Sequence, residues 1–182
     1  MNSLTLGKSK PSKIALIFGA LLLTSSLTSC SLDGGSEEAT SNQTQQEQNM
    51  ADSNREYLTV SNEPGVEPKV GKPIGEAPTS LVSQDIIVGT GDEVLSTSTL
   101  TAHYQLISWK SGEILQSSWK SGPFTTTLDG VIVGWQQGLP GMKAGGRRLL
   151  VIPPELAYGA AGNGPIGPNE AIAFVVDLIS VQ

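Results

Sequence analysis

The chain has 182 residues, 38% of them hydrophobic, and carries 17 acidic against 11 basic side chains, for a net charge of −6. This length suits one domain with extensions, and the charge excludes nucleic acid as a partner because no basic stripe is present to displace counterions from phosphates. A single cysteine excludes an internal disulfide, and a single histidine excludes a histidine-rich metal centre, so we expect no metal and no other cofactor.

The first 29 residues have the pattern of a secretory signal peptide. Three lysines, the last of them Lys13, precede the apolar run 14–23, which is too short to span a bilayer. The following stretch, Leu27-Thr28-Ser29-Cys30, resembles the lipobox of bacterial lipoproteins. This resemblance implies that residues 1–29 are removed and that Cys30 is lipidated, which would anchor the protein to the extracytoplasmic face of a bacterial cell membrane. The alternative is an ordinary signal peptide followed by an incidental cysteine.

Residues 30–67 are expected to form a flexible, acidic and polar linker. They hold eight acidic residues and one basic residue, Arg55, and up to Met50 they contain almost nothing apolar. The stretch 57–60 and the prolines that follow it precede the domain, and the sequence does not decide whether they are ordered. It also leaves open whether residues 51–79 pack on the domain. We predict the folded domain at residues 68–182.

The domain is predicted to be an α+β fold, an antiparallel sheet with one short helix. Period-two alternation and β-branched residues favour strands at 84–88, 97–109, 124–128, 147–152 and 171–181, separated by glycine turns. The helix is expected at 132–139, where Val131, Ile132 and Trp135 share one face. Because a helix of about two turns is not stable alone, this face must pack on the sheet or line a pocket.

Most enzyme classes are excluded by what the chain lacks. His103 has no second imidazole to work with, and no serine stands in a Gly-x-Ser-x-Gly elbow. Residues 162–167 match the GxGxxG pattern, but Pro165 interrupts the backbone that would hold a phosphate, and no helix pattern follows.

The remaining aromatic and aliphatic motifs resemble the FKBP-type peptidyl-prolyl cis/trans isomerases, in order and nearly in spacing, over about residues 80–182. The motifs that carry the resemblance are Ala-His-Tyr (102–104), Gln-Ser-Ser-Trp (116–119), Pro-Phe (123–124), Val-Ile-Val-Gly-Trp (131–135), Gly-Leu-Pro-Gly-Met (138–142), Ile-Pro-Pro-Glu-Leu-Ala-Tyr-Gly (152–159) and Ala-Phe-Val-Val-Asp-Leu (173–178). The resemblance implies a five-stranded antiparallel sheet wrapped around one short helix, with a pocket between them.

The same resemblance implies the residues of the site. Trp135 would form the floor, Val131 and Ile132 would line the helix start, and the backbone N–H of Ile132 would bind a substrate carbonyl. The walls would be Tyr104, Phe124, Tyr158 and Phe174, with Ile166 at the rim. Leu115 and Gln116 stand where the family usually has Phe-Asp, a departure that bears on catalytic efficiency and on macrolide binding.

The function implied is acceleration of X–Pro isomerisation in unfolded or loop segments of exported proteins, with macrolides as candidate ligands. An apolar pocket suffices because rotation about the bond is limited by amide resonance and needs no acid, base or metal. The alternative is a chaperone or partner-binding module of the same fold with little or no catalysis.

Overall fold

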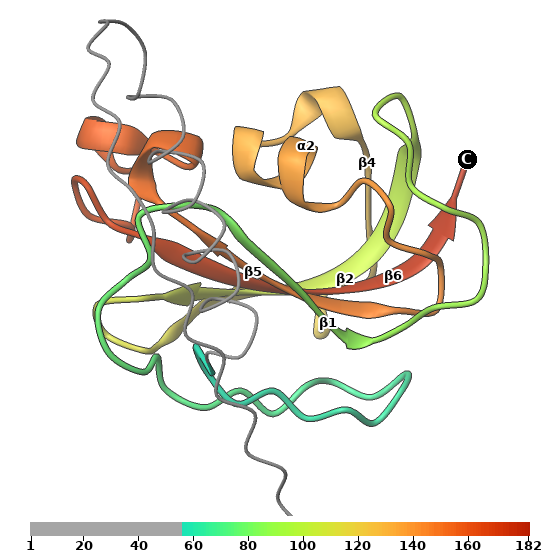
Figure 1. The fold of residues 1–182 in the computed structure, drawn as a ribbon, viewed down its shortest axis with the longest axis horizontal. Coiled ribbons are helices and arrows are strands. Elements are labelled where there is room, and N and C mark those ends of the chain that lie inside the picture. The colour runs from blue at the N-terminus through green and yellow to red at the C-terminus, as the bar shows by residue number, and fades with distance from the viewer. Residues whose placement is uncertain (1–55) are drawn as a thin grey trace, which may run out of the picture.

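The computed structural model describes residues 56–182, which form an antiparallel sheet with a short helix over one face (Figure 1). The sheet order is β1-β5-β6-β2-β3, and β4 also pairs with β2. In chain order the strands and the α-helix are β1 (Val82–Ile87), β2 (Thr99–Ser108), β3 (Ile114–Ser117), β4 (Phe124–Thr127), α2 (Val133–Gly138), β5 (Arg147–Ile152) and β6 (Ile172–Val181). The predicted α+β class is therefore confirmed.

The sheet of residues 56–182 has six strands where five were predicted. The extra strand is β3, of which Ile114, Gln116 and Ser117 pair with residues 105–107 of β2, while β4 pairs with residues 99–102 of the same strand. Because β6 occupies the other edge of β2, β3 and β4 share one edge, and the six strands occupy five positions across the sheet.

Helix α2 lies close to the sheet because it presents glycines to it. A Cβ at Gly134 would overlap the side chain of Ile152, and one at Gly138 would lie 2.7 Å from Cδ2 of Leu150. Trp135 and Leu139 pack into the main core on this inner face of the sheet, together with Ile172, Phe174, Val176 and Leu178 from β6. The helix spans 133–138, one residue shorter at each end than predicted.

The outer face of the sheet is covered by residues 56–80, here called the N-terminal strap (Figure 1). Tyr57 and Leu58 are 1% and 3% exposed and pack on Val151, Ala173 and Val175, which belong to a second core cluster. Val60 and Val70 form an isolated antiparallel bridge. The strap thus folds back on itself while it lies on the sheet.

A buried arginine fastens the strap to the sheet. Arg147 on β5 is fully buried, and its guanidinium donates to Asp177 Oδ1 and to the backbone carbonyls of Ser61 and Val66, at 2.6–2.8 Å. Glu67 accepts a hydrogen bond from Gln105 on β2. The sequence left open whether residues 51–79 pack on the domain, and the structure places residues 57–67, which lie before the predicted domain start at 68, against the sheet.

Residues 1–55 lie outside the described part of the chain. They include the predicted signal peptide, Cys30 and most of the predicted linker. No helix within residues 56–182 has the length and apolar character needed to cross a membrane.

Candidate active site

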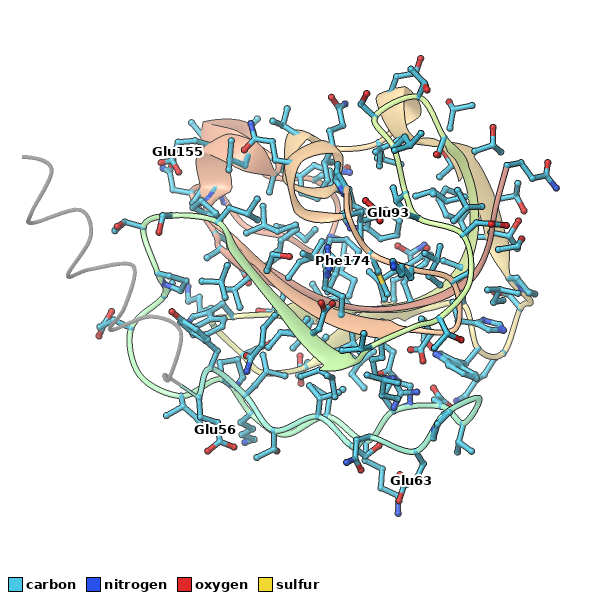
Figure 2. The ribbon with its side chains drawn as sticks, turned by 45° about the vertical axis from the view of Figure 1, so that its right-hand side comes forward. Glu56, Glu63, Glu93, Glu155 and Phe174 are labelled. Carbon is cyan, nitrogen blue, oxygen red and sulfur yellow. The ribbon has the colours of Figure 1, made fainter. Side chains whose placement is uncertain are left out.

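A cavity of about 230 Å³ lies between α2 and the inner face of the sheet. We call it the aromatic cavity. Its lining comes from β2, β3, β4, the approach to α2, α2 itself, the loop after β5 and β6, and comprises Tyr104, Gln116, Phe124, Gly130, Val131, Ile132, Trp135, Tyr158 and Phe174. Eight of the ten residues predicted for the site therefore meet in one place. Figure 2 shows one of them, Phe174, above the sheet on the helix side.

Four aromatic rings organise this cavity around Tyr104. Its ring centre lies 5.7 Å from that of Phe124, 5.9 Å from that of Trp135 and 6.0 Å from that of Phe174. Trp135 and Phe174 also meet edge to face, at 5.2 Å and 83°. Rings in this arrangement hold one another in place, which makes the cavity walls stiff before any ligand arrives.

Trp135 is only 3% exposed, yet it is one of the residues that line the cavity. It comes from the first turn of α2, where its backbone N–H donates to the carbonyl of Ile132 at 3.0 Å. Because the helix begins at Val133, the N–H of Ile132 has no acceptor within the helix. Gln136 holds this approach in place by donating from Nε2 to the carbonyl of Val131 at 2.8 Å.

The polar side-chain groups of the cavity are two phenols, one amide and the indole N–H of Trp135, which is buried without a hydrogen-bond partner. The pKa of Tyr104 is raised, mainly because the ring is removed from water and secondly because Tyr158 lies near it, so this phenol stays protonated and can donate a hydrogen bond at neutral pH. Gln116 is exposed and contributes an uncharged side chain. No carboxylate or imidazole is part of this lining.

Leu115 and Ile166 are the two predicted site residues that do not line the cavity. Leu115 is half-buried and packs against the inner core, and Ile166 is 5% exposed within that core rather than at a rim. Gly130 lines the cavity although the prediction omitted it, and the signal available was its position directly before Val131.

Residues 56–182 contain no group of three or more histidine, cysteine, aspartate or glutamate side chains placed to hold a metal ion. His103 does not line the cavity: its ring stacks on Trp119 at 4.2 Å, and its Nδ1 lies 3.0 Å from Ser118 Oγ.

Comparisons with known proteins agree with this architecture. A family model described as FKBP-type peptidyl-prolyl cis-trans isomerase matches residues 91–179. A probable FK506-binding protein of Corynebacterium glutamicum is 46% identical over 114 residues, which is 62% of this chain and 97% of that protein. FkpA of Escherichia coli K12, a peptidyl-prolyl cis-trans isomerase, is 39% identical over 111 residues, 61% of this chain and 41% of FkpA.

Solved structures show the same relationship. The crystal structure of E. coli FkpA superposes with a TM-score of 0.56 at 31% identity, over 79% of this chain and 60% of that one. The crystal structure of AtFKBP13 gives a TM-score of 0.53 at 34% identity, over 58% of this chain and 96% of that one.

Fold and cavity together define a small α+β domain in which a sheet and one short helix enclose an aromatic binding pocket. Together with the comparisons, the fold and the cavity show that the chain belongs to the FKBP-type peptidyl-prolyl cis-trans isomerases. Its substrates are accordingly proline-containing polypeptides, and its activity is the interconversion of their cis and trans X–Pro bonds.

Proposed function

We propose that the aromatic cavity is where this chain isomerises X–Pro bonds, and that it does so on exported proteins from a lipid anchor at Cys30. The observation that carries the site assignment is the convergence of Trp135, Tyr104, Phe124 and Phe174 on one cavity of about 230 Å³, which is large enough for a proline ring and part of its neighbour.

The cavity would lower the rotation barrier by replacing water around the reacting amide. Rotation costs ~18–20 kcal/mol because resonance is lost when the amide twists. The twisted amide is less polar than the planar one, so an apolar site favours the transition state over the ground state. An acceleration of ~10⁴–10⁶ needs ~5–8 kcal/mol, which desolvation and a few oriented contacts can supply.

Seven of the nine lining residues have a proposed role in that process. Trp135 is the floor under the proline ring, and Tyr104, Phe124, Tyr158 and Phe174 are the walls. The N–H of Ile132 would donate to the substrate carbonyl, while Val131 covers the entry beside it. For Leu115 and Ile166, which do not line the cavity, we propose support of the walls from behind.

The anchor and location rest on the sequence. A basic and apolar leader followed by Leu27-Thr28-Ser29-Cys30 favours processing at Cys30 and diacylation there, and two acyl chains hold a protein on a bilayer more firmly than one. The domain would then act at the extracytoplasmic face of a bacterial cell membrane. Cys30→Ser should move the protein from the membrane to the soluble fraction and abolish incorporation of labelled fatty acid.

The activity is tested with a proline tetrapeptide, measured by protease-coupled isomerisation with the full chain. We expect a rate proportional to enzyme concentration and well above the uncatalysed rate. Peptide binding with an uncatalysed rate would instead favour a chaperone or partner-binding module of the same fold. A macrolide that occupies the aromatic cavity should inhibit competitively, and Gln116 is the residue whose replacement should change its affinity.

A further inference from the structure

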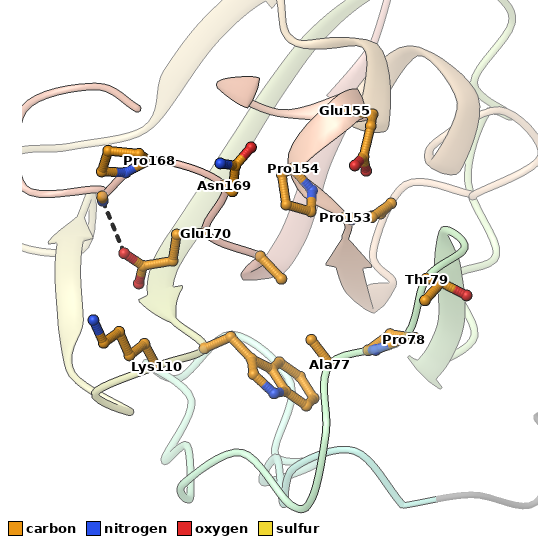
Figure 3. A pocket seen from close by; sticks show the side chains of 13 residues that line it. Ala77, Pro78, Thr79, Lys110, Pro153, Pro154, Glu155, Pro168, Asn169 and Glu170 are labelled. Atoms are coloured by element: carbon orange, nitrogen blue, oxygen red, sulfur yellow. Dashed lines mark hydrogen bonds between the residues drawn. The ribbon is translucent and has the colours of Figure 1, made fainter. Parts of the chain in front are cut away.

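A second and larger cavity, of about 530 Å³, lies at the end of the sheet where β2 and β5 stop and β6 begins (Figure 3). We call it the proline-lined cavity. Its apolar walls are the indole of Trp109 on one side and Pro78, Pro153, Pro154 and Pro168 around it. None of these residues lines the aromatic cavity.

The walls of the proline-lined cavity are rigid. Proline has a fixed φ and almost no side-chain freedom, and the indole of Trp109 is held by a hydrogen bond from Nε1 to the carbonyl of Gly75, at 3.3 Å, and by an edge contact with Tyr57, at 6.4 Å. A cavity that exists before the ligand arrives binds it without a large ordering cost. Because Gly75, Tyr57 and Pro78 belong to the strap, the docked strap builds one side of this site.

The charges around the proline-lined cavity limit what it can hold. Two carboxylates, Glu155 and Glu170, and one ammonium, Lys110, are among its lining residues. Glu170 is fixed by hydrogen bonds from Ser108 Oγ and from the N–H of Gly167, and its pKa is lowered despite the opposing effect of burial. Glu155 is exposed at the rim. The resulting excess of negative charge disfavours anionic ligands and suits an apolar ligand with cationic groups.

The two cavities lie on either side of one segment of chain. Pro153, Pro154 and Glu155 border the proline-lined cavity, and Tyr158, three residues further on, borders the aromatic cavity. The same spacing separates Ala171, which directly precedes β6, from Phe174 on β6, a distance of about 10 Å along an extended chain. A polypeptide bound in one cavity therefore reaches the other within several extended residues.

We propose that the proline-lined cavity is a second subsite that binds an extended, apolar and cationic segment of the same client polypeptide whose X–Pro bond occupies the aromatic cavity. This inference rests on the proposed function of the aromatic cavity. The subsite has no part in the bond rotation. It raises the local concentration of X–Pro bonds at the aromatic cavity when the substrate is a long chain.

The test compares a short and a long substrate on the same variants of the full chain. Thr79→Trp places an indole in the proline-lined cavity at an exposed residue. The short substrate is a proline tetrapeptide, and the long one is a reduced, carbamidomethylated protein with apolar and cationic segments, whose refolding is limited by one X–Pro bond. We expect kcat/KM for the tetrapeptide to stay within twofold of wild type and catalysis of refolding to fall about fivefold or more.

Two controls sharpen this comparison. Thr97→Trp adds the same indole at an exposed threonine near the opposite end of β2, and should change neither assay. A proline-free peptide of about ten residues with alternating leucine and lysine, long enough to fill the cavity, should inhibit refolding catalysis of the wild type but not tetrapeptide turnover.

The inference is overturned if the ratio of the two activities in Thr79→Trp stays within twofold of wild type, whether both fall or neither does. It is also overturned if the proline-free peptide inhibits both assays equally, because that result would place its binding in the aromatic cavity. A wild-type chain that leaves the tetrapeptide at its uncatalysed rate would instead contradict the proposed function.

Discussion

The two faces of the sheet are built from neighbouring residues of the same strands, yet one face encloses a cavity and the other is filled. On β6, Phe174 points to the inner face, and Ala173 and Val175 point to the outer one. Among aliphatic neighbours, the inner face carries rings that meet edge to face beside a helix of only six residues. The buried hydrophobic strand side chains of the outer face are all aliphatic, and the strap packs directly on them.

This difference shows how one sheet can carry a binding cavity on its inner face and a closely packed, stabilising layer on its outer face. The short helix is too small to fill the inner face, so a cavity remains there in place of close packing. Ring contacts at 5–6 Å keep the walls of this cavity rigid. The outer face regains stability by burying apolar surface under the strap and by satisfying the strap's carbonyls with Arg147. We expect damage to the inner face to reduce activity first, and damage to the outer face to reduce stability first.

The largest effect is expected on the outer face, from Arg147→Met. This change leaves Asp177, whose pKa burial already raises against the opposing influence of Arg147, without its cation, and breaks the bonds to Ser61 and Val66. Removing one member of a buried ion pair costs ~3–5 kcal/mol, and chemical denaturation should show a loss of that size.

A matched control for the outer face is the double variant Arg147→Met with Asp177→Leu. It removes both charges, so we expect it to recover part of the lost stability. If the single variant is as stable as wild type, the guanidinium does not hold the strap, and the contrast between the two faces fails.

On the inner face, Trp135→Leu should reduce kcat/KM for a proline tetrapeptide by about 10- to 100-fold, equivalent to ~1.4–2.8 kcal/mol. The indole is both a lining residue of the cavity and a ring partner of Tyr104 and Phe174, and leucine replaces neither contact. His103→Ala is the control: its ring stacks on Trp119 away from the cavity, so activity should stay within twofold. A large loss in His103→Ala would contradict the mechanism.

A third variant, Glu170→Gln, tests the junction between the two faces. Glutamine can accept the Ser108 bond but loses the charge that Gly167 N–H and Lys110 favour, and because the group is partly exposed we expect a loss of only about 1 kcal/mol at pH 7. A carboxylate whose folded pKa is lowered stabilises the fold above its ordinary value of 4.5 and loses that effect as the pH falls through the folded pKa.

The difference in denaturation midpoint between wild type and Glu170→Gln should therefore become smaller as the pH is lowered below 4.5. Glu155→Gln is a suitable control, because Glu155 lines the same cavity and is exposed. A stability difference for Glu170→Gln that does not change with pH would mean that the charge of Glu170 is not what fixes the loop.

The smallest effect is expected from Gln116→Ala, at the edge of the aromatic cavity. The amide is exposed and uncharged, so its hydrogen bonds compete with water and losing one should cost about twofold in kcat/KM. Tetrapeptide assays at low substrate concentration resolve such a change. A tenfold loss would show that Gln116 contributes more to the transition state than its exposure indicates.

The sequence predicted the inner face well because that face depends on local patterns. Alternation along residues 171–181 predicted a strand, and Ile172, Phe174, Val176 and Leu178 share its inner face. The spacing of Val131, Ile132 and Trp135 indicated a short helix that packs on the sheet or lines a pocket, and the pocket itself was implied by the family resemblance. The four residues of β3 were missed because only one of them, Ile114, is β-branched, whereas the equally short β4 contains three threonines that favoured a strand. The buried positions of Ile166 and Leu115 depend on tertiary packing, which the spacing of motifs does not report.

The outer face could not be predicted in the same way. Tyr57 and Leu58 are two apolar residues in an acidic, proline-rich stretch, and such a pair is too short to indicate packing. The contacts that hold the strap run from Arg147 to the backbone carbonyls of Ser61 and Val66, and any residue type can offer a carbonyl. Nothing in the sequence therefore marks these two acceptors as partners of an arginine more than 80 positions away.

The strap also fixes the face of the domain at which the preceding chain joins it. Glu56 and Glu63 lie below the sheet, while Phe174 and the aromatic cavity lie above it (Figure 2). If Cys30 carries a lipid, as we propose, the chain that follows it would join the strap at Glu56. The tether would therefore meet the domain on the outer face of the sheet. The cavity that receives proline lies on the opposite face of the sheet, so the tether would not cover its entrance.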